Sequence, residues 1–184
     1  MTESLQGRLL VSAPQLRDPH FDRTVVLCLE HDEEGSLGVV LNRPGALGVS
    51  DVLAGWEALA ADPAVVFEGG PVSPNGVLGL GLLRAGATLP GARQVTGRLV
   101  ILDLEADPML VAPAVEQVRL FAGYAGWASG QLEDELEVGG WFVVEGFDDD
   151  AVAFQAEDLW RGVLRRQGGR LAWVANFPPD ASLN

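Results

Sequence analysis

The sequence contains no lysine, and all 12 of its basic residues are arginines. Against them stand 26 acidic residues, which give a formal net charge of −14 at pH 7. This charge disfavours non-specific attraction to nucleic acid or to an anionic membrane. The missing lysine also excludes the lysine-containing phosphate loop of many nucleotide-binding proteins. We therefore expect neither direct nucleic-acid binding nor a membrane partner.

Cysteine and long apolar runs are equally scarce. Cys28 is the only cysteine, so the chain cannot form an intrachain disulfide. No stretch approaches the roughly 18 consecutive apolar residues that cross a bilayer. The opening residues, MTESLQGRLLVSAP, lack the basic region and the apolar core of a signal peptide. These features predict a cytoplasmic protein.

What the chain does contain is typical of a globular protein. It has 184 residues, of which 48% are hydrophobic and 21% are charged. This length supports one core, and the sequence shows neither an internal repeat nor a long linker. We therefore expect a single domain over residues 1–184.

Short runs rich in β-branched residues recur along the chain and predict strands. They cover residues 7–13, 24–31, 36–42, 64–70, 76–84, 97–103, 118–126 and 141–146. The acidic, glycine-ended turn at 32–35 predicts a hairpin between the second and third of these runs. Because strands outnumber helices and do not alternate with them, the pattern favours the α+β class.

Apolar residues at helical spacing predict helices in three places. We expect a helix over residues 50–61 with Ser50 as its cap, and another that begins at Ser129. The third covers residues 156–167 and ends at Gly168. Its inward face is expected to carry Leu159, Trp160, Val163 and Leu164.

Four polar residues near the predicted hairpin are candidates for ligand binding: Arg23, His31, Asn42 and Arg43. Pairing of the hairpin places His31 beside the turn, and Asn42 and Arg43 near Arg23 at the opposite end. The two arginines either form ion pairs that fix the loops or present a guanidinium fork to a carboxylate or phosphate. The carboxylates available for such ion pairs are Asp18, Asp22 and Glu68.

Patterns for catalysis and metal binding are missing around the obvious residues. His20 and His31 are the only histidines, and they show no H-x-H or H-x-x-x-H spacing. No serine lies in a G-x-S-x-G sequence. Cys28 lies in the apolar run VVLCLE, which favours a buried thiol. We therefore expect no catalytic residue, no metal site and no cofactor.

An acidic segment follows in the last third of the chain. Between Arg119 and Arg161 there is no basic residue, but there are ten acidic ones: Glu133, Asp134, Glu135, Glu137, Glu145, Asp148, Asp149, Asp150, Glu157 and Asp158. The segment 133–158 is either a solvated face or a docking surface for a basic protein partner. Asp148, Asp149 and Asp150 are expected to occupy an exposed loop.

Three strings of residues, in this order, resemble the YqgE/AlgH family of small bacterial proteins. They are GRLLVSAP with the following DPHFDRTVVLCLEH and GSLGVVLNRP, then FEGGPV at 67–72, and then FAGYAGWASGQLEDEL at 121–136. The resemblance implies an α+β fold in which a bent, mixed but largely antiparallel sheet forms a pseudo-barrel with helices packed outside. One branch of that family is associated with control of alginate production and labelled a transcriptional regulator, without an agreed biochemical activity.

Two hypotheses about function follow. The first is a cytosolic, non-enzymatic protein with a regulatory or protein-interaction role, which contacts protein partners through the acidic segment 133–158. The alternative is a small-molecule or anion-binding protein, or an enzyme, that uses Arg23, Asn42 and Arg43. The oligomeric state stays open at this stage.

Overall fold

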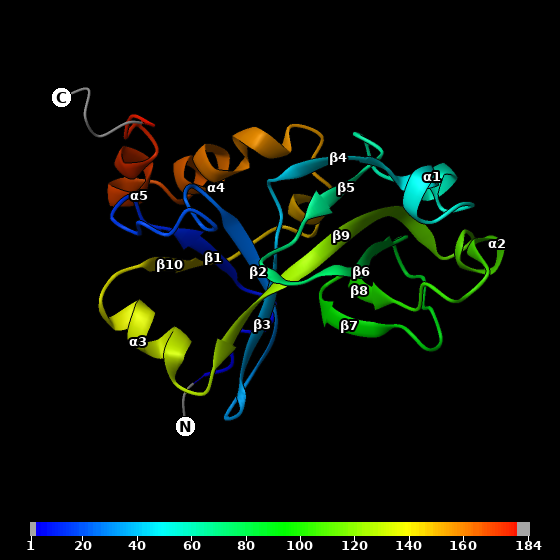
Figure 1. The fold of residues 1–184 in the computed structure, drawn as a ribbon, viewed down its shortest axis with the longest axis horizontal. Helices are drawn as coiled ribbons and strands as arrows, with labels where there is room; N and C mark the ends of the chain where they lie inside the picture. Colours follow the sequence, from blue (N-terminus) through cyan, green and yellow to red (C-terminus); the bar gives the residue numbers. More distant parts are fainter. Residues whose placement is uncertain (1–2, 180–184) are drawn as a thin grey trace.

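The fold is organised around one long strand, β9 (Val115–Ala128), which crosses the molecule diagonally (Figure 1). The computed structural model describes residues 3–179. Its sheet has the strand order β10-β1-β2-β3-β9-β6-β8-β7, with β4 paired to β5 and β5 paired in parallel to β9. The other strands are β1 (Leu9–Ser12), β2 (Val25–Asp32), β3 (Gly35–Val40), β4 (Pro44–Gly48), β5 (Val65–Glu68), β6 (Val72–Leu83), β7 (Arg93–Thr96), β8 (Leu99–Leu102) and β10 (Trp141–Val144).

The two halves of the sheet share β9 because different parts of it pair with different neighbours. Residues 125–128 pair with β3, whereas residues 115–124 pair with β6. At the change of partner, the FEGGPV string passes over the FAGYAG string. A Cβ atom on Gly70 would collide with the main chain of Tyr124, and one on Gly123 would collide with the carbonyl oxygen of Gly70. Glycine is therefore required where the two strings cross.

The helices are short and lie at the outside of the sheet (Figure 1). α4 and α5 cover one end, α3 flanks β10, and α1 and α2 lie at the far end of β9. Their bounds are α1 (Val49–Val52), α2 (Pro108–Val111), α3 (Gln131–Glu137), α4 (Leu159–Gln167) and α5 (Gly169–Val174), with 3₁₀ turns η1 (Glu57–Leu59), η2 (Asp148–Val152) and η3 (Ala156–Asp158). This arrangement confirms the predicted α+β class with a curled, largely antiparallel sheet.

The helix expected over residues 50–61 is wrong. α1 ends at Val52, and Gly55 has a φ of +95°, which a continuing helix cannot contain. The apolar residues at helical spacing are still used, because Trp56 is only 2% exposed in a core cluster beneath β8 and β9. Irregular backbone can therefore bury the same residues that a helix would have buried.

The C-terminal helix follows the sequence more closely. All four side chains predicted on its inward face are buried, and they pack in the cluster that also holds Leu27 and Phe121. Gly168 ends α4 with a φ of +72°. By contrast, α3 is capped by Gly130, and the Ser129 hydroxyl donates instead to the Glu33 carbonyl at 2.7 Å. Within residues 3–179, no helix is long and apolar enough to cross a membrane.

Candidate functional site

The structure separates the four candidate residues into two places, as the hairpin pairing implied. β2 and β3 pair with His31 opposite Ser36, so His31 lies near the turn. Arg23, Asn42 and Arg43 lie at the other end, where the Asn42 amide donates to the Arg23 carbonyl at 2.8 Å. The four residues therefore do not form one site.

His31 is fully engaged inside the fold. Its side chain is 4% exposed, and Nδ1 accepts a hydrogen bond from the Leu5 N–H at 3.0 Å. Because Nδ1 accepts, Nε2 carries the proton, and it donates to Glu133 at 2.9 Å. This hydrogen bond from His31 lowers the pKa of Glu133. The ring joins the N-terminal segment, the hairpin and α3, and neither nitrogen is available to a ligand.

Asn42 and Arg43 hold the loop 19–23 in place. The Asn42 side chain accepts from the Val25 N–H at 2.9 Å, in addition to its bond to Arg23. The Arg43 guanidinium donates to the carbonyl oxygens of Pro19, His20 and Asp22. The sequence suggested carboxylate partners for Arg43, but its hydrogen bonds within residues 3–179 run to main-chain oxygens. Both side chains thus act as internal supports for the loop.

Arg23 reaches further, to the C-terminal segment of the chain. It has a φ of +51°, which is uncommon for a residue other than glycine. Its guanidinium stacks 4.8 Å from the centre of the Trp160 ring and donates to the Phe177 carbonyl at 2.6 Å. Burial, followed by the positive charge of Arg161, lowers the pKa of Arg23. Arg23 therefore fastens Phe177 beside α4.

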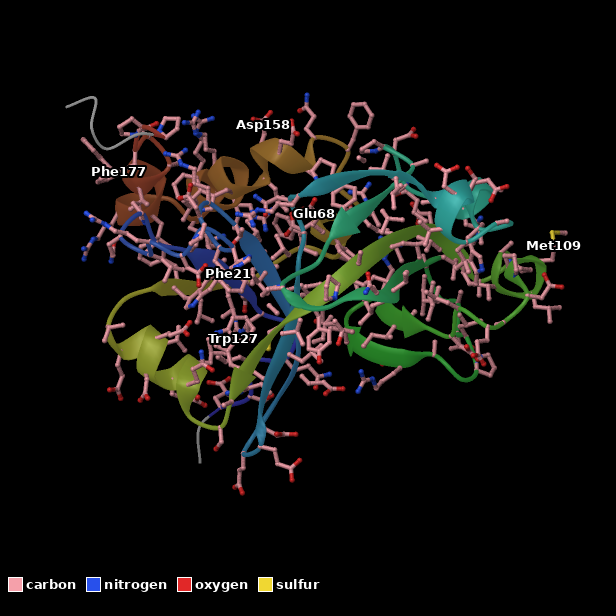
Figure 2. All side chains as sticks on the ribbon, in the orientation of Figure 1. Phe21, Glu68, Met109, Trp127, Asp158 and Phe177 are labelled. Atoms are coloured by element: carbon pink, nitrogen blue, oxygen red, sulfur yellow. The ribbon has the colours of Figure 1, made fainter. Side chains whose placement is uncertain are left out.

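Phe177 forms part of an open hollow between α5 and the start of β10, which we call the arginine groove. Its volume is about 500 Å³, and its lining consists of Pro14, Gln15, Gly139, Phe142, Arg170, Leu171, Val174 and Phe177. Among the described residues that line it, Arg170 is the only charged one. Phe177 is 51% exposed, and it lies at the C-terminal end of the molecule (Figure 2). The groove combines apolar walls with one positive charge.

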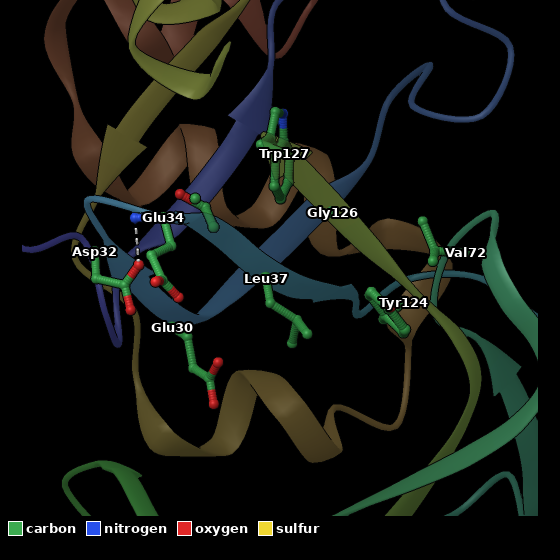
Figure 3. A pocket seen from close by; sticks show the side chains of 10 residues that line it. Glu30, Asp32, Glu34, Leu37, Val72, Tyr124, Gly126 and Trp127 are labelled. Carbon is green, nitrogen blue, oxygen red and sulfur yellow. Dashed lines mark hydrogen bonds between the residues drawn. The ribbon is translucent and has the colours of Figure 1, made fainter. Parts of the chain in front are cut away.

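A second hollow, the acidic hollow, lies between the β2–β3 hairpin and the end of β9 (Figure 3). Its volume is about 390 Å³, and its lining consists of Glu30, Asp32, Glu34, Gly35, Ser36, Leu37, Val72, Tyr124, Gly126 and Trp127. All its charged lining residues are acidic. Glu30 pairs with Arg93, and the Asp32 carboxylate accepts from the Glu34 N–H at 2.8 Å. Trp127 is only 5% exposed, so it forms a packed corner with Phe21 and Trp141.

The acidic segment 133–158 is largely occupied by internal contacts. Six of its ten acidic residues bond to other parts of the fold: Glu133, Glu135, Glu145, Asp148, Asp149 and Asp150. The expectation of an exposed loop is wrong for Asp150, which is 6% exposed in η2 and forms a two-pronged ion pair with Arg166. Arg166 lies 16 positions after Asp150, on α4. The run of acidic residues around Asp150 therefore does not indicate that Asp150 has a basic partner.

Two further buried polar residues serve the fold. Cys28 is fully buried, and burial raises the pKa of its thiol to about 12. Arg119 is 2% exposed, stacks on Phe67 and donates to the carbonyls of Asp62 and Ala153, while burial lowers its pKa to about 10. Among residues 3–179 no group of three or more His, Cys, Asp or Glu side chains could hold a metal ion.

Sequence reasoning found Arg23 but missed the groove beside it. The helix expected over residues 156–167 ends before Arg170, and Phe177 lies beyond it in a stretch without a predicted element. Phe142 comes from a strand more than 120 residues after Pro14 in the chain, and both line the same hollow. The exposed aromatic residues Trp173 and Phe177 near several arginines were the available signal.

Comparisons with known proteins agree with the fold. A family model described as AlgH-like matches residues 9–172. A UPF0301 protein of Streptomyces avermitilis is 57% identical over 190 residues, which cover 100% of this chain and 98% of that protein. A UPF0301 protein of Mycobacterium tuberculosis is 47% identical over 181 residues, covering 97% of this chain and 90% of the relative. These names state no reaction, substrate or partner.

Two solved structures share the architecture. A crystal structure of a protein from Corynebacterium diphtheriae has a TM-score of 0.91 and 35% identity, covering 96% of this chain and 94% of that one. The solution structure of the AlgH protein from Pseudomonas aeruginosa has a TM-score of 0.70 and 26% identity, covering 98% and 100%. With the sequence matches, these likenesses span nearly the whole chain, and the protein belongs to the AlgH-like family.

Proposed function

We propose that this protein works in the cytoplasm by binding a segment of a partner protein in the arginine groove, in a regulatory role without a reaction of its own. The segment carries both carboxylate and apolar side chains. The observation that carries the proposal is the lining of the groove, where apolar side chains surround Arg170, the one charged lining residue within 3–179. The Arg170 guanidinium complements a carboxylate of the bound segment, and the apolar walls complement its apolar side chains.

The state of the other candidate residues supports binding over catalysis. The ring nitrogens of His31 and the amide of Asn42 are bonded within the fold. The Arg43 guanidinium is directed at loop carbonyls. In contrast, Arg170 is exposed, and Trp173 on the same helix is 78% exposed. Exposed aromatic residues and arginines are the side chains that contribute most at protein interfaces.

Docking of a basic partner on the acidic segment 133–158 is our weaker proposal. Six of its ten acidic residues already have internal partners, and only Asp134, Glu137, Glu157 and Asp158 are left. These four residues belong to α3 and to η3, which lie on different sides of the molecule (Figure 1). They do not form a continuous acidic surface.

Selection of peptides tests the proposed function directly. A random library of twelve-residue peptides displayed on phage is selected on the full-length protein, and the winners are synthesised for fluorescence anisotropy. We expect peptides with carboxylate and apolar residues and dissociation constants of roughly 1–100 μM, as is usual for small interfaces. Arg170→Glu reverses the charge of the groove and should lower the affinity of the selected peptides about tenfold or more.

A matched control comes from Arg84, an exposed arginine after β6 in the other half of the molecule. Arg84→Glu changes the net charge equally, so it reports the long-range effect alone. Equal losses in the two variants, or winners without carboxylates, would contradict the proposal. Full displacement of the winners by millimolar hexanoate would instead favour the alternative, a small-molecule site for carboxylates.

A further inference from the structure

We infer that the bound segment is extended and adds to the sheet as a strand beside β10. This inference rests on the proposed function and defines its binding mode. β10 ends the strand order, with β1 as its only strand neighbour within residues 3–179. Strand addition supplies affinity through main-chain hydrogen bonds and selectivity through alternate side chains.

The register shows which residues of β10 face outward. The Ala13 N–H donates to the Gly140 carbonyl at 2.9 Å, whereas the Ser12 N–H donates to Thr24 on the other side. Bonding therefore alternates along β1, since each residue of a central strand bonds to one neighbour only. Val143 lies opposite Leu10, which belongs to the set that bonds to β2. The N–H and C=O of Val143 consequently point away from β1.

The outward groups of Trp141 and Val143 have no hydrogen-bond partner within the described part of the chain. Val143 is 38% exposed, which leaves its edge open to another chain. Trp141 is only 3% exposed, so Val143 is the residue of β10 at which another chain can pair. A partner strand would supply the missing hydrogen bonds at Val143.

The arginine groove adjoins β10 at Phe142, on the face of the strand that carries this side chain. Phe142 lines the groove together with Leu171 and Val174, and all three are partly buried and pack against the same core cluster. Side chains on this face of an added strand would enter the groove between Phe142 and α5, within reach of Arg170. The free edge of β10 would bind the main chain of the segment, and the arginine groove would bind its acidic and apolar side chains. These two features together fit an extended segment in which acidic and apolar residues alternate.

The test uses the selected peptides and two variants of the full chain. Val143→Pro removes the outward N–H without removing a bond to β1, and an edge strand accepts proline at such a position. Val143→Ala keeps the N–H and is the matched control. We expect Val143→Pro to lose about tenfold or more in affinity, and Val143→Ala to stay within about twofold.

Methylation of single peptide nitrogens gives an independent measurement that does not depend on folding of the proline variant. Strand addition predicts that methyl groups at every second position abolish binding, while those between are tolerated. Peptides that bind Val143→Pro normally and ignore the position of methylation, yet fail on Arg170→Glu, overturn strand addition and leave groove binding intact. Failure to select any peptide sensitive to Arg170→Glu overturns both.

Discussion

The arginine groove and the acidic hollow are similar in size and opposite in charge. Around the acidic hollow, Glu30 is paired with Arg93 and Asp32 bonds its own turn. Arg23 and Arg43 are directed inward at carbonyl oxygens, whereas Arg170 in the groove is left exposed. Acidic residues are abundant in this chain and arginines are few, so an unengaged arginine on an apolar wall is the more informative feature.

The comparison teaches that local sequence charge does not predict which charge is free. The acidic segment looked available, and most of it is engaged. Arg170 lies beyond the predicted C-terminal helix, and it supplies the exposed cation of the groove. We expect the effects of substitution to decrease from the buried ion pair of Asp150 to the surface charge of Glu30.

The ion pair between Asp150 and Arg166 should be the most costly to break. Asp150→Asn leaves Arg166 without its carboxylate partner, and we expect a loss of about 2–3 kcal/mol in the free energy of unfolding, measured by urea denaturation. Asp149→Asn is the matched control, because its side chain is 78% exposed. It should change stability by less than about 0.5 kcal/mol. Equal effects would restore the interpretation of 148–150 as a solvated loop.

Removal of the side chain that supports the loop 19–23 should have a smaller effect. Arg43→Met deletes the donors to Pro19, His20 and Asp22, and we expect a loss of about 1–2 kcal/mol because water can replace part of these bonds. Amide hydrogen exchange should accelerate across residues 19–23. Arg84→Met serves as the control and should leave both readouts unchanged. If the amides of residues 19–23 exchange as slowly in Arg43→Met as in the wild type, the loop is stable without the hydrogen bonds of Arg43.

Near the acidic hollow, Glu133 should make stability depend on pH. Its pKa is lowered in the folded state, so its contribution is present above the unfolded value of about 4.5 and is lost as pH falls through the folded value. Its carboxylate is 34% exposed, so we expect an effect below about 1 kcal/mol. The difference in unfolding free energy between the wild type and Glu133→Gln should therefore shrink as pH falls below about 4.5. A constant difference down to pH 2.5 would contradict this assignment.

The smallest effect is expected when charge is removed from the acidic hollow itself. Glu30→Gln should change the affinity of groove-binding peptides by less than about twofold at physiological salt, because charges separated by more than about 8 Å are largely screened. Anisotropy titrations at two salt concentrations would measure this. A tenfold change would mean that the two hollows act together.

Much of the fold was predictable because its signals are local. The hairpin follows from two β-branched runs around an acidic turn, and α4 follows from Leu159, Trp160, Val163 and Leu164. The failure at residues 50–61 is also local in origin. Trp56 is buried equally well from an irregular turn, so helical spacing alone did not decide the backbone.

The candidate site was only half predictable, since its parts are distant in sequence. Arg23 and Asn42 could be brought together through one hairpin. Phe142 and Pro14 line the same groove because β10 pairs with β1. No local sequence pattern predicts that pairing. The same holds for Asp150 and Arg166, whose attraction appears only when α4 folds back onto η2.

The pairing of β1 with β10 also has a consequence for folding kinetics. Leu9 lies opposite Val144, so the first strand of the chain completes its bonding only after nearly the whole sequence is available. Contacts of such long sequence separation slow folding, because loop-closure entropy is lost before they form. During synthesis, the outer edge of β1 stays open until β10 leaves the ribosome. We expect slow refolding in a single phase, and a chain truncated before residue 141 should associate through the exposed edge of β1.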